Sequence, residues 1–243
     1  VGSGKYNSIP YLATEYIEGH SLRDLIDSGT LLIEDALKLV IKIAQGLAYC
    51  HEKGVIHRDL KPENIFVLES GQPVILDFGL ALTKKAHRVT YSNLSAAMGT
   101  PDYMAPEQFE GLRGDARTDI YALGTIAFEM LTGQLPFGGD TQIAVMNQHL
   151  NGTAPRPDQI NPQVSKNIAA IILKCLSRQP DDRYLDMNAL IIALEHPEQV
   201  DISMLDSVKK TVSESHSSLK YVGIAFLILI VVIGLAFLLQ ALR

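Results

Sequence analysis

The chain has 243 residues and a formal net charge of −6 at pH 7. This length suits one sizeable domain with an appendage, or two small domains. The negative charge argues against a nucleic-acid-binding surface, because such surfaces are usually basic. The cysteines, Cys50 and Cys175, lie far apart in apolar helical patterns. We therefore expect buried thiols in a reducing compartment rather than a disulfide or a metal site.

The N-terminal stretch predicts little regular structure before residue 11. The chain begins at Val1 without a Met or a signal-like segment, and we expect it to be part of a longer protein. Gly2-Ser3-Gly4-Lys5 lacks the glycine spacing of a phosphate-binding loop, so residues 1–10 are interpreted as a turn that connects strands. Residues 11–17 are apolar and β-prone, which predicts a strand that ends at Glu18-Gly19.

Hydrophobic periodicity then predicts a series of helices. Ser21 and Asp24 have the spacing of an N-terminal capping box, so a short helix should begin there. Residues 33–53 carry apolar side chains three and four positions apart, which predicts a long helix that Gly54 ends. Further helices are expected at residues 119–131, 142–150, 165–177 and 187–194, with a proline-rich loop at 155–162.

The run from His57 to Asn64, His-Arg-Asp-Leu-Lys-Pro-Glu-Asn, collects polar groups with one shared use. An Asp that accepts a hydroxyl proton, a Lys two residues on and an Asn three beyond it suit phosphoryl transfer from ATP to an alcohol. The apolar runs 65–68 and 74–76 predict a hairpin, and the second run leads into Asp77-Phe78-Gly79. An Asp and an Asn from different loops suit Mg²⁺, which prefers oxygen ligands.

These strings resemble the catalytic loop and the metal-binding motif of eukaryotic-type (Hanks-type) serine/threonine protein kinases. Residues 99–107, Gly-Thr-Pro-Asp-Tyr-Met-Ala-Pro-Glu, resemble the end of the activation segment in that family. The resemblance covers residues 11–194 and points to the bacterial membrane-anchored kind. It implies an α+β, protein-kinase-like fold, made mainly of the helical C-terminal lobe with a remnant of the small lobe and followed by one transmembrane helix.

The resemblance also implies a role for each motif residue. Asp59 would orient or deprotonate the substrate hydroxyl, Lys61 would stabilise the transferring phosphoryl group, and Thr100 would help to place the hydroxyl. Asn64 and Asp77 would hold Mg²⁺. The other ATP-binding positions would be the gatekeeper Thr14, the backbone of Glu15 and Ile17 at the adenine edge, and Phe66 on the adenine floor.

Structural roles are implied for His57, Phe78, Gly79, Glu107, Asp119 and Arg183. Glu107 would form a buried ion pair with Arg183, and Asp119 would hold the backbone of the catalytic loop. From the residues alone, Asp119 is equally well interpreted as an ordinary acid at a helix N-terminus.

Residues 81–98 are polar, show little periodicity and predict a solvated loop, which the resemblance identifies as an activation segment. Our hypothesis is that phosphate on Thr90, Ser92 or Ser95 pairs with Arg58 and orders this segment, because phosphate and guanidinium form strong charge-assisted hydrogen bonds.

The C-terminal part predicts a membrane anchor. Residues 197–219 are rich in polar side chains and suggest a juxtamembrane linker. The apolar run 221–242 would span roughly 33 Å as a helix, enough to cross a hydrocarbon core of about 30 Å. We expect a transmembrane helix at 220–243, a small-lobe remnant and hinge at 1–19, and the large lobe at 20–196. One basic residue at each end gives no orientation, but the need for ATP places the kinase domain on the cytoplasmic side of the inner or plasma membrane.

The expected function is transfer of the ATP γ-phosphate to Ser/Thr hydroxyls of protein substrates in membrane-anchored signalling, with ATP and Mg²⁺ as cofactors and no nucleic-acid partner. A homodimer would allow trans-autophosphorylation. The Gly-rich loop, strand Lys and helix Glu of a small lobe cannot be found here, so we expect this chain by itself to be inactive. The alternative is a membrane-tethered pseudokinase that acts as a binding or scaffold module. A small-molecule phosphotransferase is a second rival, against which residues 81–107 favour protein substrates.

Overall fold

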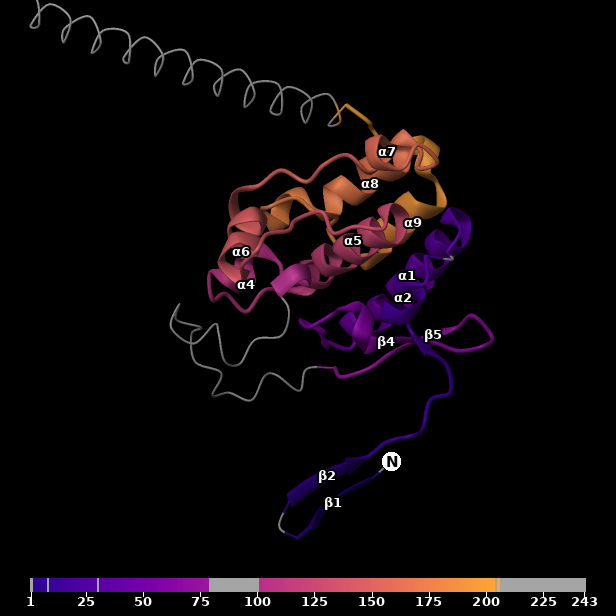
Figure 1. The fold of residues 1–243 in the computed structure, drawn as a ribbon, viewed down its shortest axis with the longest axis vertical. Coiled ribbons are helices and arrows are strands. Elements are labelled where there is room, and N and C mark those ends of the chain that lie inside the picture. The colour runs from indigo at the N-terminus through magenta and orange to yellow at the C-terminus, as the bar shows by residue number, and fades with distance from the viewer. Residues whose placement is uncertain (1, 8, 30, 79–100, 204, 206–243) are drawn as a thin grey trace, which may run out of the picture. The chain divides into compact units, whose positions relative to one another are not determined.

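The computed structural model describes residues 2–7, 9–29, 31–78, 101–203 and 205. The chain divides into two units, residues 1–200 and 201–243. All helices and strands given below belong to the first unit, which contains two small antiparallel sheets and a larger set of helices (Figure 1).

The first sheet is a hairpin of β1 (Gly2–Tyr6) and β2 (Ile9–Ala13), with Gly2 opposite Ala13. The predicted turn over residues 1–10 is therefore wrong: the turn is confined to the neighbourhood of Asn7, whose φ is 48°. Gly4 leaves room for the Tyr11 ring of the opposite strand. A Cβ at Gly4 would lie only 2.7 Å from the Tyr11 hydroxyl oxygen. The predicted strand at 11–17 correspondingly begins and ends earlier, since pairing with β1 stops at Ala13.

The second sheet has the order β3-β4-β5, with β3 (His20–Ser21), β4 (Ile65–Val67) and β5 (Pro73–Ile75). The predicted hairpin of residues 65–68 and 74–76 is confirmed by the antiparallel pairing of β4 with β5. Strand β3 is too short to predict from periodicity. It lies against β4 because Gly19 has no side chain: a Cβ there would collide with the Val67 carbonyl oxygen.

The first two helices agree with their sequence signals. Helix α1 (Leu22–Asp27) begins with the predicted capping box, in which the Ser21 hydroxyl accepts from the Asp24 N–H at 3.1 Å and the Asp24 carboxylate accepts from the Ser21 N–H at 3.3 Å. Helix α2 (Ile33–Glu52) buries the predicted apolar stripe. Gly54, with φ of 74°, follows the end of α2 in the left-handed conformation that favours glycine.

Helix α5 (Ala116–Thr132) is at the centre of the helical core. It packs against α2, α8 (Lys166–Cys175) and α9 (Met187–Glu195), as Figure 1 shows. The helix begins three residues before the prediction, because the Asp115 side chain accepts from the Arg117 N–H at 2.8 Å and caps it. Burial on every side explains why its sequence is apolar all round.

The remaining elements are shorter. They are η1 (Pro62–Asn64), η2 (Pro101–Tyr103), α4 (Pro106–Phe109), α6 (Gln142–Asn151), α7 (Pro157–Ile160), η3 (Pro180–Asp182) and η4 (Pro197–Gln199). Helices α6, α8 and α9 match the predicted ranges to within a few residues, whereas α7 lies in a stretch predicted as a loop. Within the described ranges, no helix is both long and apolar enough to cross a membrane, and the predicted transmembrane segment 220–243 lies outside them.

The two thiols differ in environment. Cys175 is completely buried, and burial raises the pKa of its thiol to about 12. Cys50 is half-buried, and both thiols are free. The expectation of buried thiols holds for Cys175, whereas Cys50 is less buried than its apolar helical pattern suggests.

Candidate active site

The backbone of the catalytic loop is held by Asp119, which is completely buried in the first turn of α5. One carboxylate oxygen accepts from the His57 N–H at 2.9 Å and the other from the Arg58 N–H at 2.8 Å. His51, on α2, places its Nε2 2.7 Å from the same carboxylate. An ionised carboxylate only accepts, so His51 donates. Asp119 is thus an anchor for the loop and not merely an acid at a helix N-terminus.

The side chain of His57 joins the catalytic loop to the strand that leads into Asp77. The Asp59 N–H donates to Nδ1 of His57 at 3.3 Å, so the ring proton is on Nε2, which donates to the Leu76 carbonyl at 2.8 Å. The ring also packs against Phe78, with 4.8 Å between centroids. Because His57 is buried, these contacts fix its neighbour Asp59 relative to the end of β5.

Arg58 has a left-handed backbone, with φ of 66°. Such a conformation costs roughly 1 to 3 kcal/mol in a residue other than glycine, so its surroundings must impose it. They do so on both sides: Asp119 holds the Arg58 N–H, and Gln108 Nε2 donates to the Arg58 carbonyl at 2.8 Å. The side-chain Nε donates to the Arg113 carbonyl at 3.1 Å. Burial and the charge of Arg113 lower the pKa of Arg58.

Asp59, Lys61 and Asn64 come together as the sequence predicts. Asn64 is buried and donates from Nδ2 to the Asp59 carbonyl at 2.8 Å, while the same Nδ2 lies 3.5 Å from the Asp59 carboxylate. The Lys61 ammonium lies 3.4 Å from that carboxylate. The Asp59 side chain is 55% exposed. Its backbone is fixed, but its carboxylate is accessible to a reactant.

A backbone hydrogen bond of the preceding residue, Leu76, keeps Asp77 close to Asn64. The Leu76 N–H donates to the Asn64 carbonyl at 2.8 Å, and Asp77 follows directly with an exposed side chain and a left-handed φ of 58°. The amide nitrogen of Asn64 donates to Asp59, so its amide oxygen is the atom that could coordinate a cation. One amide oxygen and one carboxylate suit Mg²⁺, which completes its octahedron with water and phosphate oxygens. In the described part of the chain, no cluster of three His, Cys, Asp or Glu side chains forms an all-protein metal site.

The residues predicted to bind ATP lie on two segments of the described chain. Thr14 and Glu15 are exposed and Ile17 is half-buried, all in the irregular stretch between β2 and β3. Phe66 is half-buried on β4 opposite Ser21. Their roles stay predictions. Five further predicted residues lie outside the described residues: Gly79, Thr90, Ser92, Ser95 and Thr100.

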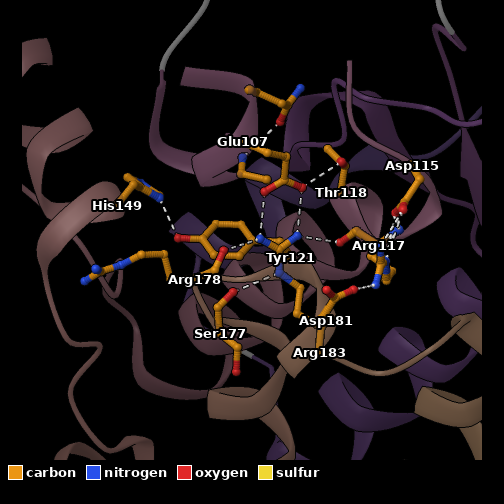
Figure 2. A network of polar contacts seen from close by, with 12 residues as sticks. Glu107, Asp115, Arg117, Thr118, Tyr121, His149, Ser177, Arg178, Asp181 and Arg183 are labelled. Carbon is orange, nitrogen blue, oxygen red and sulfur yellow. Dashed lines mark hydrogen bonds and ion pairs between the residues drawn. The ribbon is translucent and has the colours of Figure 1, made fainter. Parts of the chain in front are cut away.

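Glu107 and Arg183 form the predicted buried ion pair (Figure 2). It is bidentate, with Arg183 NH1 2.8 Å and NH2 2.7 Å from the two carboxylate oxygens. Thr118 donates its hydroxyl to the same carboxylate at 2.8 Å. Burial alone raises the pKa of the Glu107 carboxyl, but the hydrogen bond and charge of Arg183 lower it below the ordinary value. The pair therefore joins α4 to the loop before α9 as a permanently charged unit.

The remaining donors of Arg183 are also satisfied. They bind the backbone carbonyls of Ser177 at 2.8 Å, Arg117 at 2.9 Å and Arg178 at 3.0 Å. The guanidinium lies 4.8 Å from the centre of the Tyr121 ring, within the range of a cation–π contact.

The network continues from Tyr121 to His149, whose Nδ1 lies 2.8 Å from the tyrosine hydroxyl oxygen (Figure 2). His149 is buried on α6 and packs against Phe109 and Phe137. Burial lowers the pKa of His149 to about 4, so the ring is neutral at pH 7.

Two residues that position the catalytic loop were not among the sequence predictions. His51 contacts Asp119, and Gln108 fixes the Arg58 carbonyl while its amide oxygen accepts from the Ala105 N–H at 2.9 Å. The only available signal for Gln108 was its position directly after Glu107. For His51, the signal was a polar side chain in the last turn of an otherwise amphipathic helix. Neither signal specifies the contact.

Comparison with known proteins identifies this arrangement. Residues 3–197 match the family model described as the protein kinase domain. The chain belongs to the protein kinase family. The catalytic loop, Asp77 and the Glu107–Arg183 pair all lie within the matched part of this kinase.

The curated relatives of this kinase include bacterial serine/threonine kinases. A probable serine/threonine-protein kinase of Streptomyces coelicolor is 39% identical over 189 residues, which cover 77% of this chain and 28% of the relative. A probable serine/threonine-protein kinase of Clostridium perfringens is 37% identical, covering 79% and 28%. Serine/threonine-protein kinase PknB of Mycolicibacterium smegmatis is 36% identical, covering 72% and 28%. The kinase chain thus spans about 28% of the length of these relatives.

The fold of this kinase is similar to that in the crystal structure of Rad53 1-466 in complex with AMP-PNP. The TM-score is 0.64 and the identity 25%, and the match covers 82% of this chain and 49% of that chain. The protein-kinase-like fold predicted from the sequence is therefore confirmed.

Proposed function

We propose that this protein is a serine/threonine protein kinase, which transfers the γ-phosphate of ATP to Ser or Thr hydroxyls of protein substrates. One observation carries the proposal: an exposed Asp59 carboxylate lies beside Lys61 and Asn64 on a loop whose backbone is fixed by the buried Asp119. Catalysis of phosphoryl transfer depends on just such positioning.

The proposal gives a task to each polar residue of the loop, and the geometry supports it. Asp59 accepts a hydrogen bond from the substrate hydroxyl, orients it and takes its proton as the new ester forms. The ammonium of Lys61, 3.4 Å from that carboxylate, lies where it stabilises negative charge on the transferring phosphoryl group. Asn64 keeps the Asp59 backbone in place through its bond to the Asp59 carbonyl. Asn64 and Asp77 would hold Mg²⁺, which would neutralise charge on the phosphates.

The proposal also covers the contacts with the nucleotide and the activation segment. The backbone of Glu15 and Ile17, with Thr14 and Phe66, would contact the adenine of ATP, and Thr100 would help to place the hydroxyl. Phosphate on Thr90, Ser92 or Ser95 would bind Arg58. The relatives named as serine/threonine kinases support the reaction class, and the Rad53 complex with AMP-PNP, an ATP analogue, supports the nucleotide.

A membrane anchor is a further part of the proposal. Residues 220–243 would cross the membrane once, 197–219 would link them to the large lobe at 20–196, and 1–19 would be the small-lobe remnant and hinge. The apolar run 221–242 supports the anchor. The test is extraction of membranes with alkaline carbonate. The chain should stay with the lipid, and a chain ending at residue 205 should be released.

The reaction is tested by the intact mass of the protein from the complete reading frame after incubation with Mg²⁺ and ATP, beside an Asp77→Asn control. We expect added phosphate on the unmutated protein alone. We expect the 243-residue chain to gain none by itself, because the sequence offers no Gly-rich loop or strand Lys for the phosphates. Robust autophosphorylation by this chain would contradict that part of the proposal.

The same experiment separates the rival function and the dimer. If neither protein gains phosphate, although both are folded and bind nucleotide, the pseudokinase is the better description. Mixing the unmutated protein with an Asp59→Asn variant of different mass tests trans-autophosphorylation. Phosphate on the inactive partner is the result expected for transfer between two copies.

A further inference from the structure

One side chain joins helix α2 to the turn of the β4–β5 hairpin, residues 68–72. Lys42 is half-buried on α2, and its ammonium donates to the Gly71 carbonyl at 2.8 Å. The two residues are 29 positions apart in the chain. We call this contact the Lys42 link. Neither residue belongs to the motifs discussed above, and the proposed function gives the link no role.

The turn that receives the Lys42 link is closed by its own backbone. The Gly71 N–H donates to the Leu68 carbonyl at 2.8 Å. Glu69 and Ser70, at the tip, are exposed, so side-chain packing does not hold the tip in place. Because Gly71 is tied to Leu68 through its N–H and to Lys42 through its carbonyl, the link fixes the whole turn against α2.

The same face of α2 supports the second strand of the hairpin. Gly46 lies four residues after Lys42, and residues with this spacing share one face of a helix. A Cβ at Gly46 would lie 3.4 Å from the Ile75 Cδ1 atom, and α2 is in contact with β5 (Figure 1). Helix α2 also packs against α5 and α9, so it is a rigid support for the hairpin.

The other end of the hairpin carries the residues predicted to hold the metal ion. Asn64 directly precedes β4, and Asp77 follows two residues after the end of β5. Ile65 pairs with Ile75, and the Leu76 N–H donates to the Asn64 carbonyl at 2.8 Å. A short hairpin is only marginally stable unless it packs against another element. The relative placement of Asn64 and Asp77 therefore depends on how α2 holds the hairpin.

We propose that Lys42 is a positioning residue for the metal ion: by holding the turn against α2, it keeps Asn64 and Asp77 in the relative placement that a divalent cation requires. This inference rests on the proposed function, in which these two residues hold Mg²⁺. Mg²⁺ demands near-ideal octahedral geometry, so a hairpin that shifts on α2 binds it less well. Lys42 acts only through the hairpin, because its ammonium binds the Gly71 carbonyl.

The first experiment measures amide hydrogen exchange in the peptide that covers residues 68–76, in the protein from the complete reading frame and without nucleotide. Lys42→Ala should speed exchange there by roughly threefold or more, because the turn loses its support. Lys42→Arg keeps a long side chain with a charged donor and should restore most of the protection. Lys38→Ala is the matched control, since Lys38 lies one turn earlier on α2, is 67% exposed and pairs with Asp35.

The second experiment measures binding of Mn²⁺, which shares the preference of Mg²⁺ for oxygen ligands, by electron paramagnetic resonance in the presence of a non-hydrolysable ATP analogue. Lys42→Ala should raise the Kd for Mn²⁺ roughly three- to tenfold, less than the loss typical of groups that bond directly to a metal ligand. Lys42→Arg and Lys38→Ala should bind Mn²⁺ as the unmutated protein does. Asp77→Asn should bind it far more weakly.

A second variant keeps both measurements possible if Lys42→Ala does not fold. Lys42→Met retains an unbranched apolar stem of similar length and removes the ammonium, so it breaks the Lys42 link without opening a large gap beside α2. It should change hydrogen exchange and Mn²⁺ affinity in the same direction as Lys42→Ala.

The outcomes separate this inference from the proposed function. Faster exchange together with weaker Mn²⁺ binding, both restored by Lys42→Arg, supports the positioning role. Unchanged exchange overturns it, and so does faster exchange with an unchanged Mn²⁺ affinity, which would leave a purely structural contact. If the unmutated protein and Asp77→Asn bind Mn²⁺ equally well, the metal assignment of the proposed function fails and the role of Lys42 fails with it. That comparison does not involve Lys42.

Discussion

Two clusters of charged side chains in this protein differ in the length of their contacts and in their exposure to solvent. Around Glu107 and Arg183 every contact is short, from 2.7 to 3.0 Å, and the Arg183 side chain has no exposed surface. Around Asp59 the side-chain contacts are long, 3.4 Å to Lys61 and 3.5 Å to Asn64, and the carboxylate is 55% exposed. The first cluster is saturated with partners, whereas the second is fixed at the backbone and exposed at the Asp59 carboxylate.

The difference shows how to separate stability from chemistry among motif residues. A charge removed from water must be paired and hydrogen-bonded completely, so a saturated buried cluster holds the fold together. A group that exchanges a proton with a reactant must keep lone pairs accessible, so it contributes little to the fold. Substitutions in the two clusters should therefore differ most in the free energy of unfolding, and the predictions below are ordered by that quantity.

The largest effect is expected for Glu107→Ala. The substitution leaves Arg183 buried without a counter-charge, which should lower the free energy of unfolding by roughly 3 to 5 kcal/mol. For a domain of this size, that corresponds to a fall in melting temperature of about 6 to 20 °C. Glu110→Ala is the matched control, because Glu110 is exposed at the end of the same short helix. Equal melting temperatures for the two variants would contradict the assignment of the ion pair.

His149 should make the same network sensitive to acid. Its pKa is lowered by burial to about 4 in the folded state, against 6.5 for an ordinary histidine. Folding therefore favours the neutral ring, and this contribution is complete above pH 6.5 and is lost as the pH falls from 6.5 to 4. The loss should amount to about 3 kcal/mol.

Urea unfolding at pH 7 and at pH 4.5 measures this contribution. His149→Leu should be less stable at pH 7, since the Tyr121 hydroxyl loses its partner, but its stability should depend less on pH in this interval than that of the unmutated chain. Parallel pH curves for the two proteins would exclude His149 as the source.

A smaller effect is expected at the exposed edge of the network. Asp181 pairs with Arg117 at 2.6 Å, but its side chain is 90% exposed, and Arg117 also binds Asp115. Asp181→Ala should therefore lower the free energy of unfolding by less than about 1 kcal/mol. Repeating the measurement in 1 M NaCl should remove most of the difference, because salt screens exposed pairs. A loss as large as that of Glu107→Ala would show that the comparison of the two clusters is wrong.

The smallest change in stability is expected at Asp59. Asp59→Asn should alter the free energy of unfolding by no more than about 0.5 kcal/mol, since the side chain is largely in water. In the protein from the complete reading frame, the same substitution should reduce phosphate transfer by roughly 10²- to 10⁴-fold. Thermal unfolding and a phosphate-transfer assay on one preparation check both statements. A strongly destabilised variant would mean that Asp59 is a structural residue.

The fold could be predicted best where local signals and long-range packing agree. The capping box at Ser21, the long amphipathic helix α2 and the hairpin β4–β5 follow from local spacing and turn residues. The prediction was wrong for β1, where glycines suggested a turn, because the pairing with β2 is a contact that no local pattern specifies. The N-terminus of α5 was misplaced by three residues, since its cap at Asp115 precedes the apolar run.

The sequence by itself predicted the family and the partners Glu107 and Arg183, because these depend on residue type and order in specific motifs. Only the tertiary structure decided how the catalytic loop and the hairpin are held: that Asp119 binds two backbone N–H groups, that Gln108 fixes Arg58, and that Lys42 reaches Gly71 over 29 positions in the chain. The reason is physical. A hydrogen bond depends on distance and direction to within a few tenths of an ångström, and those quantities are set by how helices pack, which single-sequence patterns do not encode.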